Sequence, residues 1–402
     1  MNAIRFLISY LIIILGSKAD CDLQVKLSPS YKYIAEKASN EPESGLLLGR
    51  GGSGDIFKVY VDQSNLASDE YINLSTQHFD QSTPVALKFF QNIHPERAKK
   101  AQAQEFEMIK KLNSSSQKKI APEVYRCGVT ENNEYFIAME LMESDLFDYL
   151  MKHNCDFALD KRLEMFYDLM DLLSHLHQIN IAHCDVKPEN IGVTYDQNKL
   201  VLFDFERSSE DNTCNLGTLS YMAPDSYQSL ANHQLAKGTK SDIYAMGILM
   251  LEIETNCSYG ISELNKKANK MVYRRKQFQD HIKYIATHYF NTNDFHNVVP
   301  TKQQLVKDII VRLRYIVLAC LNELGSDRPL ANKSKIIIDI LRQTHKHILA
   351  LEYGKIDIYR FQNFVQNLSP YHTFETLNMK REIVAHSSFF EKQANVPEKL
   401  SI

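Results

Sequence analysis

The spacing of apolar residues predicts short strands before residue 142, with one helix among them. Three short apolar runs have the length and composition of β-strands: residues 56–61, 84–90 and 135–142. Residues 101–112 instead have helical spacing, with Phe106, Ile109 and Leu112 available for packing.

Helical spacing dominates the rest of the chain. One helix face is formed by apolar residues at the positions Phe166, Leu169, Met170, Leu173 and Leu176. A second helix begins at Asp242 and is apolar on nearly every side through Ile253, which is typical of a helix buried at the centre of a domain. Two closing helices are predicted at residues 305–324 and 335–349.

A polar loop, Ile181–Asn190, follows the first of these helices. Pro188 prevents further helix, so the polar side chains lie in a loop. The apolar run 200–203 then predicts a short strand that ends at Asp204. Asp185, Asn190 and Asp204 are oxygen ligands of the kind that suits a metal-bound phosphate.

A glycine-rich turn lies between two apolar runs near residue 50. Gly49, Gly51 and Gly54 let backbone amides approach phosphate oxygens that a Cβ would keep away. A dinucleotide-binding turn has the same spacing, but it requires a helix directly afterwards. Because residues 56–61 are typical of a strand instead, the pattern favours a β-hairpin over the phosphates.

The strand at residues 84–90 places Ala86 and Lys88 on one face, because side chains alternate along a strand. A small residue makes room for an adenine ring, and a lysine two places on can reach its phosphates. We interpret the polar segment 62–82 as a surface insertion, since loops tolerate added length at small entropic cost.

The composition is that of an ordinary globular chain. It has 402 residues, 44% of them hydrophobic and 24% charged, which allows an ample core. The formal net charge of -3 gives no reason to expect a nucleic-acid partner. After the first twenty residues, no stretch is long and apolar enough to span a bilayer, so no stable membrane span is expected.

The first nineteen residues have the pattern of a cleaved signal peptide. Arg5 gives a positive start, residues 6–15 are almost wholly apolar, and Ser17 and Ala19 provide small residues before the cleavage point. We therefore expect the chain to be secreted or to enter the lumen of the secretory pathway. Two alternatives are an uncleaved segment that anchors the chain in a membrane and a buried N-terminal helix.

The seven cysteines matter if the chain is secreted. Cys127 and Cys320 have apolar neighbours and are predicted to be small buried hydrophobic residues. Four others have more polar neighbours and are predicted to pair in one of three connectivities: Cys21, Cys155, Cys214 and Cys257. The odd number leaves at least one thiol unpaired within a monomer.

Two motifs together carry a resemblance to a known family. The sequence His183-Cys184-Asp185-x-Lys187-x-x-Asn190 resembles the catalytic loop of eukaryotic protein kinases. Asp204-Phe205-Glu206 resembles their magnesium-binding tripeptide. Lys187, together with Thr218, resembles the serine/threonine branch of the family.

The resemblance implies an α+β, bilobal kinase fold, with a small antiparallel β-sheet lobe that has one helix and a larger, mainly helical lobe. It divides the chain into a signal peptide at 1–19, a polar lead-in at 20–42, a kinase domain at 43–346 and a C-terminal extension at 347–402. The small lobe is expected at about 43–141 and the large lobe at about 142–346.

The resemblance also implies roles for individual residues. Asp185 is expected to orient the attacking hydroxyl and Lys187 to neutralise the transferring phosphoryl group. Asn190 and Asp204 are expected to hold Mg²⁺, with Mn²⁺ as an alternative. Lys88 is expected to be held by Glu105, with Glu107 as the competing choice. The residues expected to bind ATP are Gly49, Gly51, Gly54, Ile56, Ala86, Lys88, Glu105, Met139, Glu140 and Met142.

The implied activity is ATP-dependent phosphorylation of serine and threonine in protein substrates; nothing in the sequence indicates an oligomeric state. Two departures from the family pattern leave an alternative open, a catalytically silent kinase-like protein that binds nucleotides or proteins. Cys184 replaces an arginine that pairs with a phosphorylated segment in many family members, and a thiol cannot form that ion pair. Glu206 replaces a glycine, which restricts the backbone.

Three further features resemble the family. Residues 217–225 resemble the end of the activation segment, and Asp225 is expected to pair with Arg328. Asp242 is expected to brace the backbone of the catalytic loop. The basic cluster at 266–276 is interpreted as a solvated helix face, with a dock for acidic substrates as the alternative. Part of the aromatic tail after Tyr353 is expected to pack on the kinase body.

Overall fold

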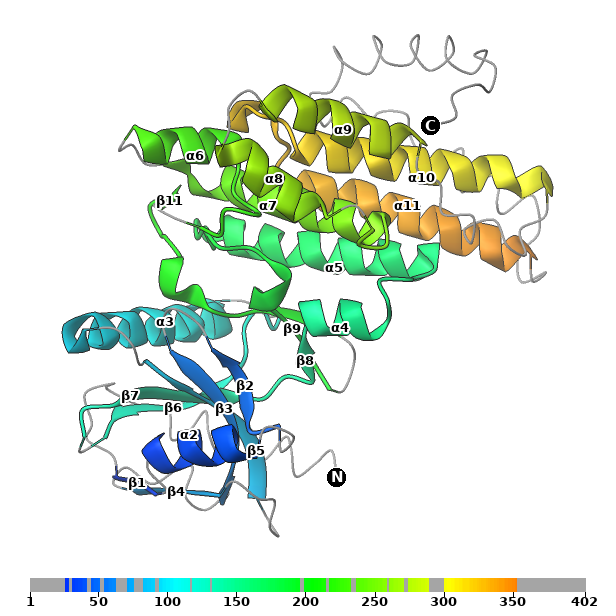
Figure 1. The fold of residues 1–402 in the computed structure, drawn as a ribbon. Coiled ribbons are helices and arrows are strands. Elements are labelled where there is room, and N and C mark those ends of the chain that lie inside the picture. Colours follow the sequence, from blue (N-terminus) through cyan, green and yellow to red (C-terminus); the bar gives the residue numbers. More distant parts are fainter. Residues whose placement is uncertain are drawn as a thin grey trace. The chain divides into compact units, whose positions relative to one another are not determined.

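The structure is a computed structural model, and it describes these residues: 26–28, 31–41, 45–50, 54–62, 71–75, 82–90, 94–115, 118–130, 132–195, 199–214, 217–232, 236–258, 260–270, 274–288 and 300–352. The expected signal peptide and the aromatic tail lie outside them. The chain divides into two compact units (Figure 1). Unit 1 is formed by residues 1–145 and 191–206, and unit 2 by residues 146–190 and 207–402.

Unit 1 contains a seven-stranded sheet with the order β1-β4-β3-β5-β7-β6, and β2 pairs with β3. All these pairs are antiparallel except β1 with β4. The strands are β1 Lys26–Ser28, β2 Leu47–Arg50, β3 Asp55–Asp62, β4 Tyr71–Ser75, β5 Ser82–Phe89, β6 Val124–Val129 and β7 Tyr135–Glu140.

One helix packs on each face of this sheet (Figure 1). Helix α2 (Tyr31–Asn40) buries Ile34 and Ala38 in a cluster with alternate residues of the central strands, which include Val85, Leu87 and Phe89. Helix α3 (Pro95–Ser115) packs on the other face, where Ala86 and Phe90 point. The strict alternation along β5 is the period-two pattern of a strand that is buried on both sides.

Two interpretations of the amino-terminal region need correction. The predicted polar lead-in contains helix α2, and the predicted surface insertion at 62–82 contains strand β4, which pairs with β3. Unit 1 therefore has two described helices where the sequence predicted one. Neither element has a long apolar run. Helix α2 buries only two side chains, and these pack against strands that lie far along the chain. Helix α3 also begins six residues earlier than predicted.

A three-stranded sheet in unit 1 presents the segment that contains Asp204. Its order is β10-β9-β8, formed by β8 Ser144–Asp145, β9 Ile191–Val193 and β10 Leu200–Leu202. The backbone N–H of Leu202 donates to the carbonyl of Ile120, 2.7 Å away, which ties β10 to the segment that follows α3. Asp204 follows β10 and precedes a 3₁₀ turn, η3 (Phe205–Arg207).

Unit 2 is mainly helical. Its helices are α4 Leu146–Lys152, α5 Leu159–Gln178, α6 Pro224–Ala231, α7 Gly238–Glu254, α8 Ile261–Lys270, α9 Arg274–His288, α10 Pro300–Cys320 and α11 Ala331–Glu352. Its shorter elements are the 3₁₀ turns η2 Pro188–Asn190 and η5 Gly325–Asp327 and the strand pair β11 Thr213–Cys214 with β12 Ala236–Lys237. As predicted, α7 is buried on nearly every side.

A buried charge cluster lies in the core of unit 2. Glu254 of α7 lies 3.1 Å from Arg162 of α5 and 3.6 Å from Arg314 of α10, measured between carboxylate oxygens and the Nε atoms. At most 5% of each side chain is exposed. Because a buried charge without a partner is costly, these pairs favour one arrangement of the three helices.

The basic cluster at 266–276 forms parts of α8 and α9. The Lys266 side chain is 38% exposed and contacts Glu263, as expected for a solvated face. Arg275 is different, because its guanidinium donates to the Tyr244 hydroxyl at 2.8 Å and to the Asn265 side chain at 3.0 Å. The predicted solvated face therefore includes a residue with a structural role in unit 2.

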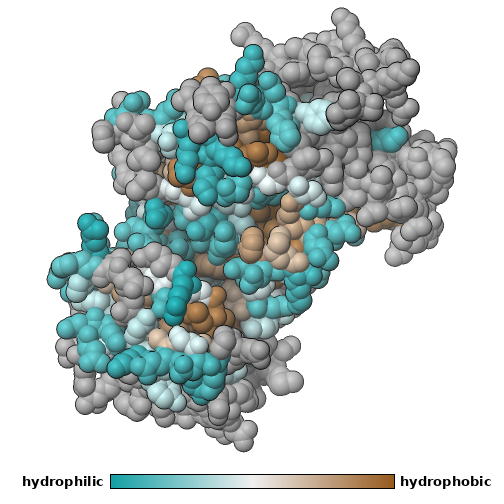
Figure 2. All heavy atoms as spheres, viewed as in Figure 1, coloured by the Kyte–Doolittle hydropathy of each residue, from teal (hydrophilic) through white to brown (hydrophobic). Residues whose placement is uncertain are grey.

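No described helix is long and apolar enough to cross a membrane. On the face of the molecule shown in Figure 2, the described surface is mostly hydrophilic, with smaller hydrophobic areas.

Candidate active site

Lys88 of β5 lies between two carboxylates in unit 1. Its Nζ atom is 2.6 Å from Glu105 Oε2 of α3 and 2.8 Å from Asp204 Oδ1. Only 5% of the Lys88 side chain and 1% of the Glu105 side chain are exposed, whereas Asp204 is 29% exposed. The competing residue, Glu107, is 70% exposed and lies beside Lys110. The structure therefore pairs Lys88 with Glu105, the residue preferred from the sequence.

Burial and charge act in opposite directions on these groups. Burial alone lowers the pKa of Lys88, but the carboxylates of Glu105 and Asp204 raise it above its ordinary value. Burial raises the pKa of Glu105 to about 7, although the adjacent Lys88 ammonium lowers it. Lys88 thus remains a cation, and the charge of Glu105 depends on pH near neutrality.

The residues expected around an adenine ring share one face of the sheet with Lys88. Ala86 pairs in register with Met139 on β7, and Ile56 on β3 pairs with Lys88. Ala86 and Met139 are 7% exposed and belong to the apolar cluster on the α3 side of the sheet, against which Ile56 packs. The period-two prediction therefore placed Ala86 and Lys88 on one face correctly, and the structure adds Ile56 and Met139 to that face.

The glycine-rich turn is described only in part. Gly54 has φ of +152°, a conformation that L side chains rarely adopt, so glycine is needed there. A Cβ added to Gly49 would meet nothing within 4 Å, and the structure shows no steric reason for glycine at that position. Gly51 lies outside the described residues.

Glu140 and Met142 lie at the end of β7. The backbone N–H of Glu140 donates to the carbonyl of Glu123 at 2.8 Å, and the Glu140 side chain binds Lys119. The backbone N–H of Glu140 is therefore used within the protein. A Cβ on Gly192 of β9 would lie 2.6 Å from the Met142 side chain, so Met142 packs closely on that strand.

The catalytic-loop residues cluster in unit 2. Asn190 Nδ2 donates to the backbone carbonyl of Asp185 at 2.9 Å and to its carboxylate at 3.3 Å. Lys187 Nζ is 3.6 Å from the same carboxylate, and Arg207 Nε is 4.0 Å from it. Asp185 and Asn190 are 6% and 4% exposed, so an amide and nearby cations fix a nearly buried carboxylate.

Thr218 binds the other oxygen of the Asp185 carboxylate. Its backbone N–H and its hydroxyl both donate to Asp185 Oδ1, at 2.7 Å and 2.8 Å. A Cβ on the preceding Gly217 would lie 2.6 Å from the carbonyl oxygen of Cys184, so only glycine allows this close approach. The segment at 217–218 is thereby held against the loop that carries Asp185.

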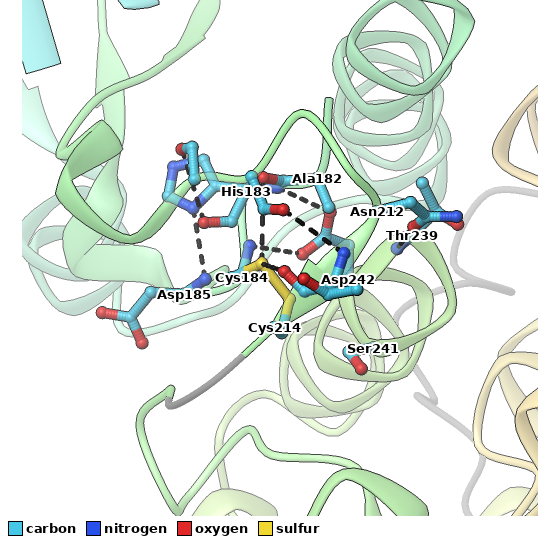
Figure 3. Close-up of a disulfide and its surroundings, with 12 residues drawn as sticks. Ala182, His183, Cys184, Asp185, Asn212, Cys214, Thr239, Ser241 and Asp242 are labelled. Atoms are coloured by element: carbon cyan, nitrogen blue, oxygen red, sulfur yellow. Dashed lines mark hydrogen bonds between the residues drawn. A yellow bond between two sulfur atoms is a disulfide. The ribbon is translucent and has the colours of Figure 1, made fainter. Parts of the chain in front are cut away.

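Asp242 braces the catalytic loop, as predicted. Its carboxylate accepts hydrogen bonds from the backbone N–H groups of His183 and Cys184 at 2.9 Å and 2.8 Å (Figure 3). A further contact at 3.0 Å comes from His177 of α5. Asp242 is only 1% exposed, and Cys184 has φ of +66°, so the brace stabilises a backbone conformation that non-glycine residues rarely adopt.

Asp225 pairs with Arg328, also as predicted. Arg328 Nη2 donates to Asp225 Oδ1 at 2.6 Å, and the other guanidinium bonds go to backbone carbonyls, which include those of Asn322 and Lys240. The Arg328 side chain is completely buried. The shorter aspartate therefore still reaches the arginine. The backbone N–H of Gly325 donates to the second oxygen of the Asp225 carboxylate at 3.0 Å.

Two residues of this region were missed by sequence reasoning. Asn265 and Asn269 of α8 both donate to the backbone carbonyl of Met222, at 3.0 Å and 2.9 Å. Asn265 also donates to the carbonyl of Ser220. Their i, i+4 spacing places them on one helix face, which is the signal that could have drawn attention to them.

The cysteine predictions were partly wrong. Cys155 pairs with Cys257, one of the pairs considered, but Cys184 pairs with Cys214. Cys184 had been interpreted only as a missing arginine. Cys127 is buried as predicted but is also disulfide-bonded, and its partner lies outside the described residues. Cys320 is a buried free thiol, as predicted, and burial raises its pKa to about 12.

Comparison with known proteins identifies the family. A family model described as a protein kinase domain matches residues 73–327. Mitogen-activated protein kinase kinase 7 of Arabidopsis thaliana is 27% identical over 232 residues, which cover 54% of this chain and 64% of that protein. A probable serine/threonine-protein kinase of Dictyostelium discoideum is 26% identical over 241 residues, 56% of this chain and 33% of that protein.

A third relative is cysteine-rich receptor-like protein kinase 2 of Arabidopsis thaliana, 26% identical over 320 residues, which cover 76% of this chain and 44% of that protein. The chain thus spans less than two thirds of the length of each of these relatives. The matched region contains Lys88, Glu105, the catalytic loop and Asp204. Because the family model covers more than half of the chain, this protein belongs to the protein kinase family.

Proposed function

We propose that this protein is an ATP-dependent serine/threonine protein kinase that transfers a γ-phosphoryl group to hydroxyls of protein substrates. The observation that carries the proposal is the position of Lys88, whose Nζ is 2.6 Å from Glu105 and 2.8 Å from Asp204. A buried lysine between two carboxylates is held in one rotamer, and its charge is maintained. That arrangement suits electrostatic recognition of phosphates.

In unit 1, the chemistry of the residues fits a nucleotide. Ile56, Ala86 and Met139 provide an apolar surface for a base on the face that carries Lys88. Lys88 would bind phosphate oxygens, and Glu105 would orient it. The exposed part of the Asp204 carboxylate would hold Mg²⁺, which neutralises phosphate charge when it is bound.

In unit 2, Asp185 would accept the proton of the substrate hydroxyl or orient that hydroxyl. Lys187 would neutralise the transferring group, and the amide oxygen of Asn190 would be a metal ligand. This assignment fits the hydrogen bonds, because the Asn190 nitrogen is already used by Asp185 and its oxygen is the atom suited to a cation. Phosphoryl transfer needs little covalent participation by the protein, so placement of charge supplies most of the catalysis.

Three observations support the serine/threonine class. Lys187 follows Asp185 by two positions, Thr218 bonds to the Asp185 carboxylate, and relatives are named as serine/threonine kinases. The substrate protein is not identified by any of them. A peptide library with serine, threonine and tyrosine acceptors would define it.

Transfer of labelled phosphate from ATP to a generic protein acceptor tests the proposal. The parent protein should phosphorylate serine or threonine, and Asp185→Asn should lower turnover by at least about 100-fold, because the proton acceptor is lost. A matched control is Asp160→Asn, which changes an exposed aspartate at the start of α5 and should leave turnover unchanged. Nucleotide binding without transfer by the parent protein would favour the silent kinase-like alternative.

We also propose that the chain resides in the secretory pathway or outside the cell. The disulfides Cys155–Cys257 and Cys184–Cys214 support this proposal, because structural disulfides persist mainly in oxidising compartments. The leader-like pattern of residues 1–19 supports it independently. N-terminal sequencing of protein expressed in a eukaryotic host tests it: a start near Asp20 agrees with cleavage, and an intact Met1 contradicts it.

A further inference from the structure

The Cys184–Cys214 disulfide joins the two segments that meet at the Asp185 carboxylate. Cys184 directly precedes Asp185, and Cys214 lies in β11, four positions before Thr218. Both cysteines are 8% exposed and form a small buried cluster with Ala182 (Figure 3). The bond therefore lies next to the hydrogen bonds from Thr218 to Asp185.

On the loop side, the position of Cys184 is fixed by α7. Its backbone N–H donates to Asp242 Oδ1, and that of His183 donates to Asp242 Oδ2 (Figure 3). A backbone bridge between Ala182 and Ser209 ties the same loop to the segment that leads to Cys214.

On the segment side, the position of Cys214 is fixed by the start of the same helix. Strand β11 pairs with β12, which directly precedes α7. Asn212 accepts hydrogen bonds from the backbone N–H groups of Gly238 at 2.8 Å and Thr239 at 2.7 Å. A Cβ on Gly238 would lie 2.5 Å from the Ala182 side chain and 3.1 Å from Cys214 Sγ, so the packing leaves no space for a side chain at position 238.

Beyond Cys214, the next described residues, Gly217 and Thr218, contact the catalytic loop. Thr218 donates twice to Asp185 Oδ1, and Gly217 packs against the carbonyl of Cys184. These are hydrogen bonds and contacts at a partly exposed position, and the disulfide is the covalent link beside them. The bond thus shortens the free chain before Thr218 to the few residues after Cys214.

We infer that the Cys184–Cys214 disulfide is a positioning element of the proposed active site, which holds Thr218 and the following segment against Asp185, so that its reduction lowers phosphoryl transfer. The inference rests on the proposed function for its effect on turnover. Its structural part, the placement of residues 217–223, can be tested whether or not the protein is a kinase.

The route for a small reductant to the bond is the pocket beside it. A pocket in unit 2 is lined by both cysteines and by Asp185, Thr218, Tyr221 and Asp242. A dithiol such as dithiothreitol would attack one sulfur, form a mixed disulfide and leave as a cyclic disulfide. The reductant gives up two electrons and two protons, and Cys184 and Cys214 become thiols.

The second described disulfide supplies the matched control. Cys155–Cys257 also lies in unit 2, and neither of its cysteines lines this pocket. Its loop is longer, with a sequence separation of 102 against 30 for Cys184–Cys214. A purely stabilising effect should therefore be larger for the control bond.

The experiment compares the double variants Cys184→Ser/Cys214→Ser and Cys155→Ser/Cys257→Ser with the oxidised parent protein. For the first variant, kcat should fall by about tenfold or more, because misplacement of catalytic groups by ~1 Å is costly. The affinity for ATP should stay within about twofold, since Lys88, Glu105 and Asp204 belong to unit 1. The control variant should keep the parent's kcat at a temperature where it is folded.

Dithiothreitol treatment gives a second measurement on unaltered protein. It should reduce kcat of the parent to the level of Cys184→Ser/Cys214→Ser, should not reduce that variant further, and should be reversed by reoxidation. Unchanged kcat in the variant and in the reduced parent would overturn the inference, and so would an equal loss in the control variant.

Amide hydrogen exchange separates this inference from the proposed function. Opening the Cys184–Cys214 bond should speed exchange at residues 217–223 and leave residues of α3 unchanged. If the parent transfers no phosphate in either redox state, the proposed function fails. The positioning inference is then still tested by the exchange rates at residues 217–223. Unchanged exchange at 217–223 in the reduced protein would overturn it.

Discussion

At the scale of single residues, the charge of Glu105 decides how firmly Lys88 is held. Burial raises the pKa of this carboxyl to about 7, and only its ionised form pairs with the Lys88 ammonium. A lysine that has lost this partner retains Asp204, which is also the expected metal ligand. The two carboxylates therefore have different tasks, although both contact the same Nζ atom.

We predict that ATP affinity falls as the pH decreases through about 7. If binding requires ionised Glu105, affinity should weaken by about tenfold between about pH 8 and pH 6, since the ionised fraction falls by that factor. The Glu105→Gln variant should bind ATP weakly at every pH and lack this step. Titrations with a fluorescent nucleotide would measure the affinity at each pH, with Glu107→Gln as a control on the exposed side of α3.

Stability should respond to the same group in the opposite direction. The pKa of Glu105 is raised from an ordinary 4.5 to about 7, so the folded chain binds a proton more readily than the unfolded chain between these values. The contribution of Glu105 is fully present below pH 4.5 and is lost as the pH rises through about 7. As the pH rises through about 7, the stability should therefore fall while the ATP affinity increases. If both fell together, the role given to Glu105 would be contradicted.

At the scale of elements, the segment between η3 and β11 is ordered by its own hydrogen bonds. The Ser208 hydroxyl is buried and donates to the carbonyl of His183 at 3.5 Å. Ser209 and Thr213 both donate to the carboxylate of Asp211, and these bonds lower the pKa of that carboxyl. Together with the disulfide at Cys214, these contacts order the segment without a phosphate group.

We predict that phosphorylation of this segment is not needed for activity. Replacing Ser208, Ser209 and Thr213 together by alanine should leave turnover within about threefold of the parent, because each lost hydrogen bond contributes only about 1 kcal/mol and the disulfide remains. Peptide phosphorylation by the dephosphorylated parent and by the triple variant would test this. Near-complete loss in both would show that a phosphate orders the segment.

At the scale of the whole molecule, long-range disulfides constrain unit 2. Cys155–Cys257 joins the segment after α4 to the turn after α7, 102 residues apart. In the chain-entropy account, a loop of this length stabilises the folded state by about 4.7 kcal/mol, and a 30-residue loop such as that of Cys184–Cys214 by about 3.7 kcal/mol. Both values are a large fraction of a typical folding free energy.

We predict that the two bonds rank differently in stability and in activity. Cys155→Ser/Cys257→Ser should lower the melting temperature more than Cys184→Ser/Cys214→Ser, because the longer loop restricts the unfolded chain more. Calorimetry of the two variants would establish the order. The reverse order of melting temperatures would contradict the loop-length argument and would indicate that local packing around each bond outweighs loop length.

Sequence reasoning succeeded where a local pattern determines an element or a face. The period-two alternation of β5 placed Ala86 and Lys88 together, and the all-round apolar pattern predicted the burial of α7. Glu105 was expected to hold Lys88, with Glu107 as the competing choice, and the structure buries Glu105. Spacing along a regular element is set by backbone geometry, so it can be calculated from the sequence.

It failed where the outcome depended on partners distant in the chain. Helix α2 and strand β4 lie in segments of polar composition, and each exists because the seven-stranded sheet offers it a surface or an edge. Cys127 was expected to be an unpaired hydrophobic residue and is disulfide-bonded. Nothing in the immediate neighbours of these residues specifies such contacts.

The sequence alone determined the family, the order of the motifs and the residue types available for phosphate chemistry, because these depend on spacing along the chain. Only the tertiary structure decided that Cys184 bonds to Cys214, since a disulfide requires two Cβ atoms within a few ångströms, and residues 30 apart meet only when the fold brings them together. The pattern thus showed that an arginine was missing at position 184, and the folded chain showed that a covalent link stands there instead.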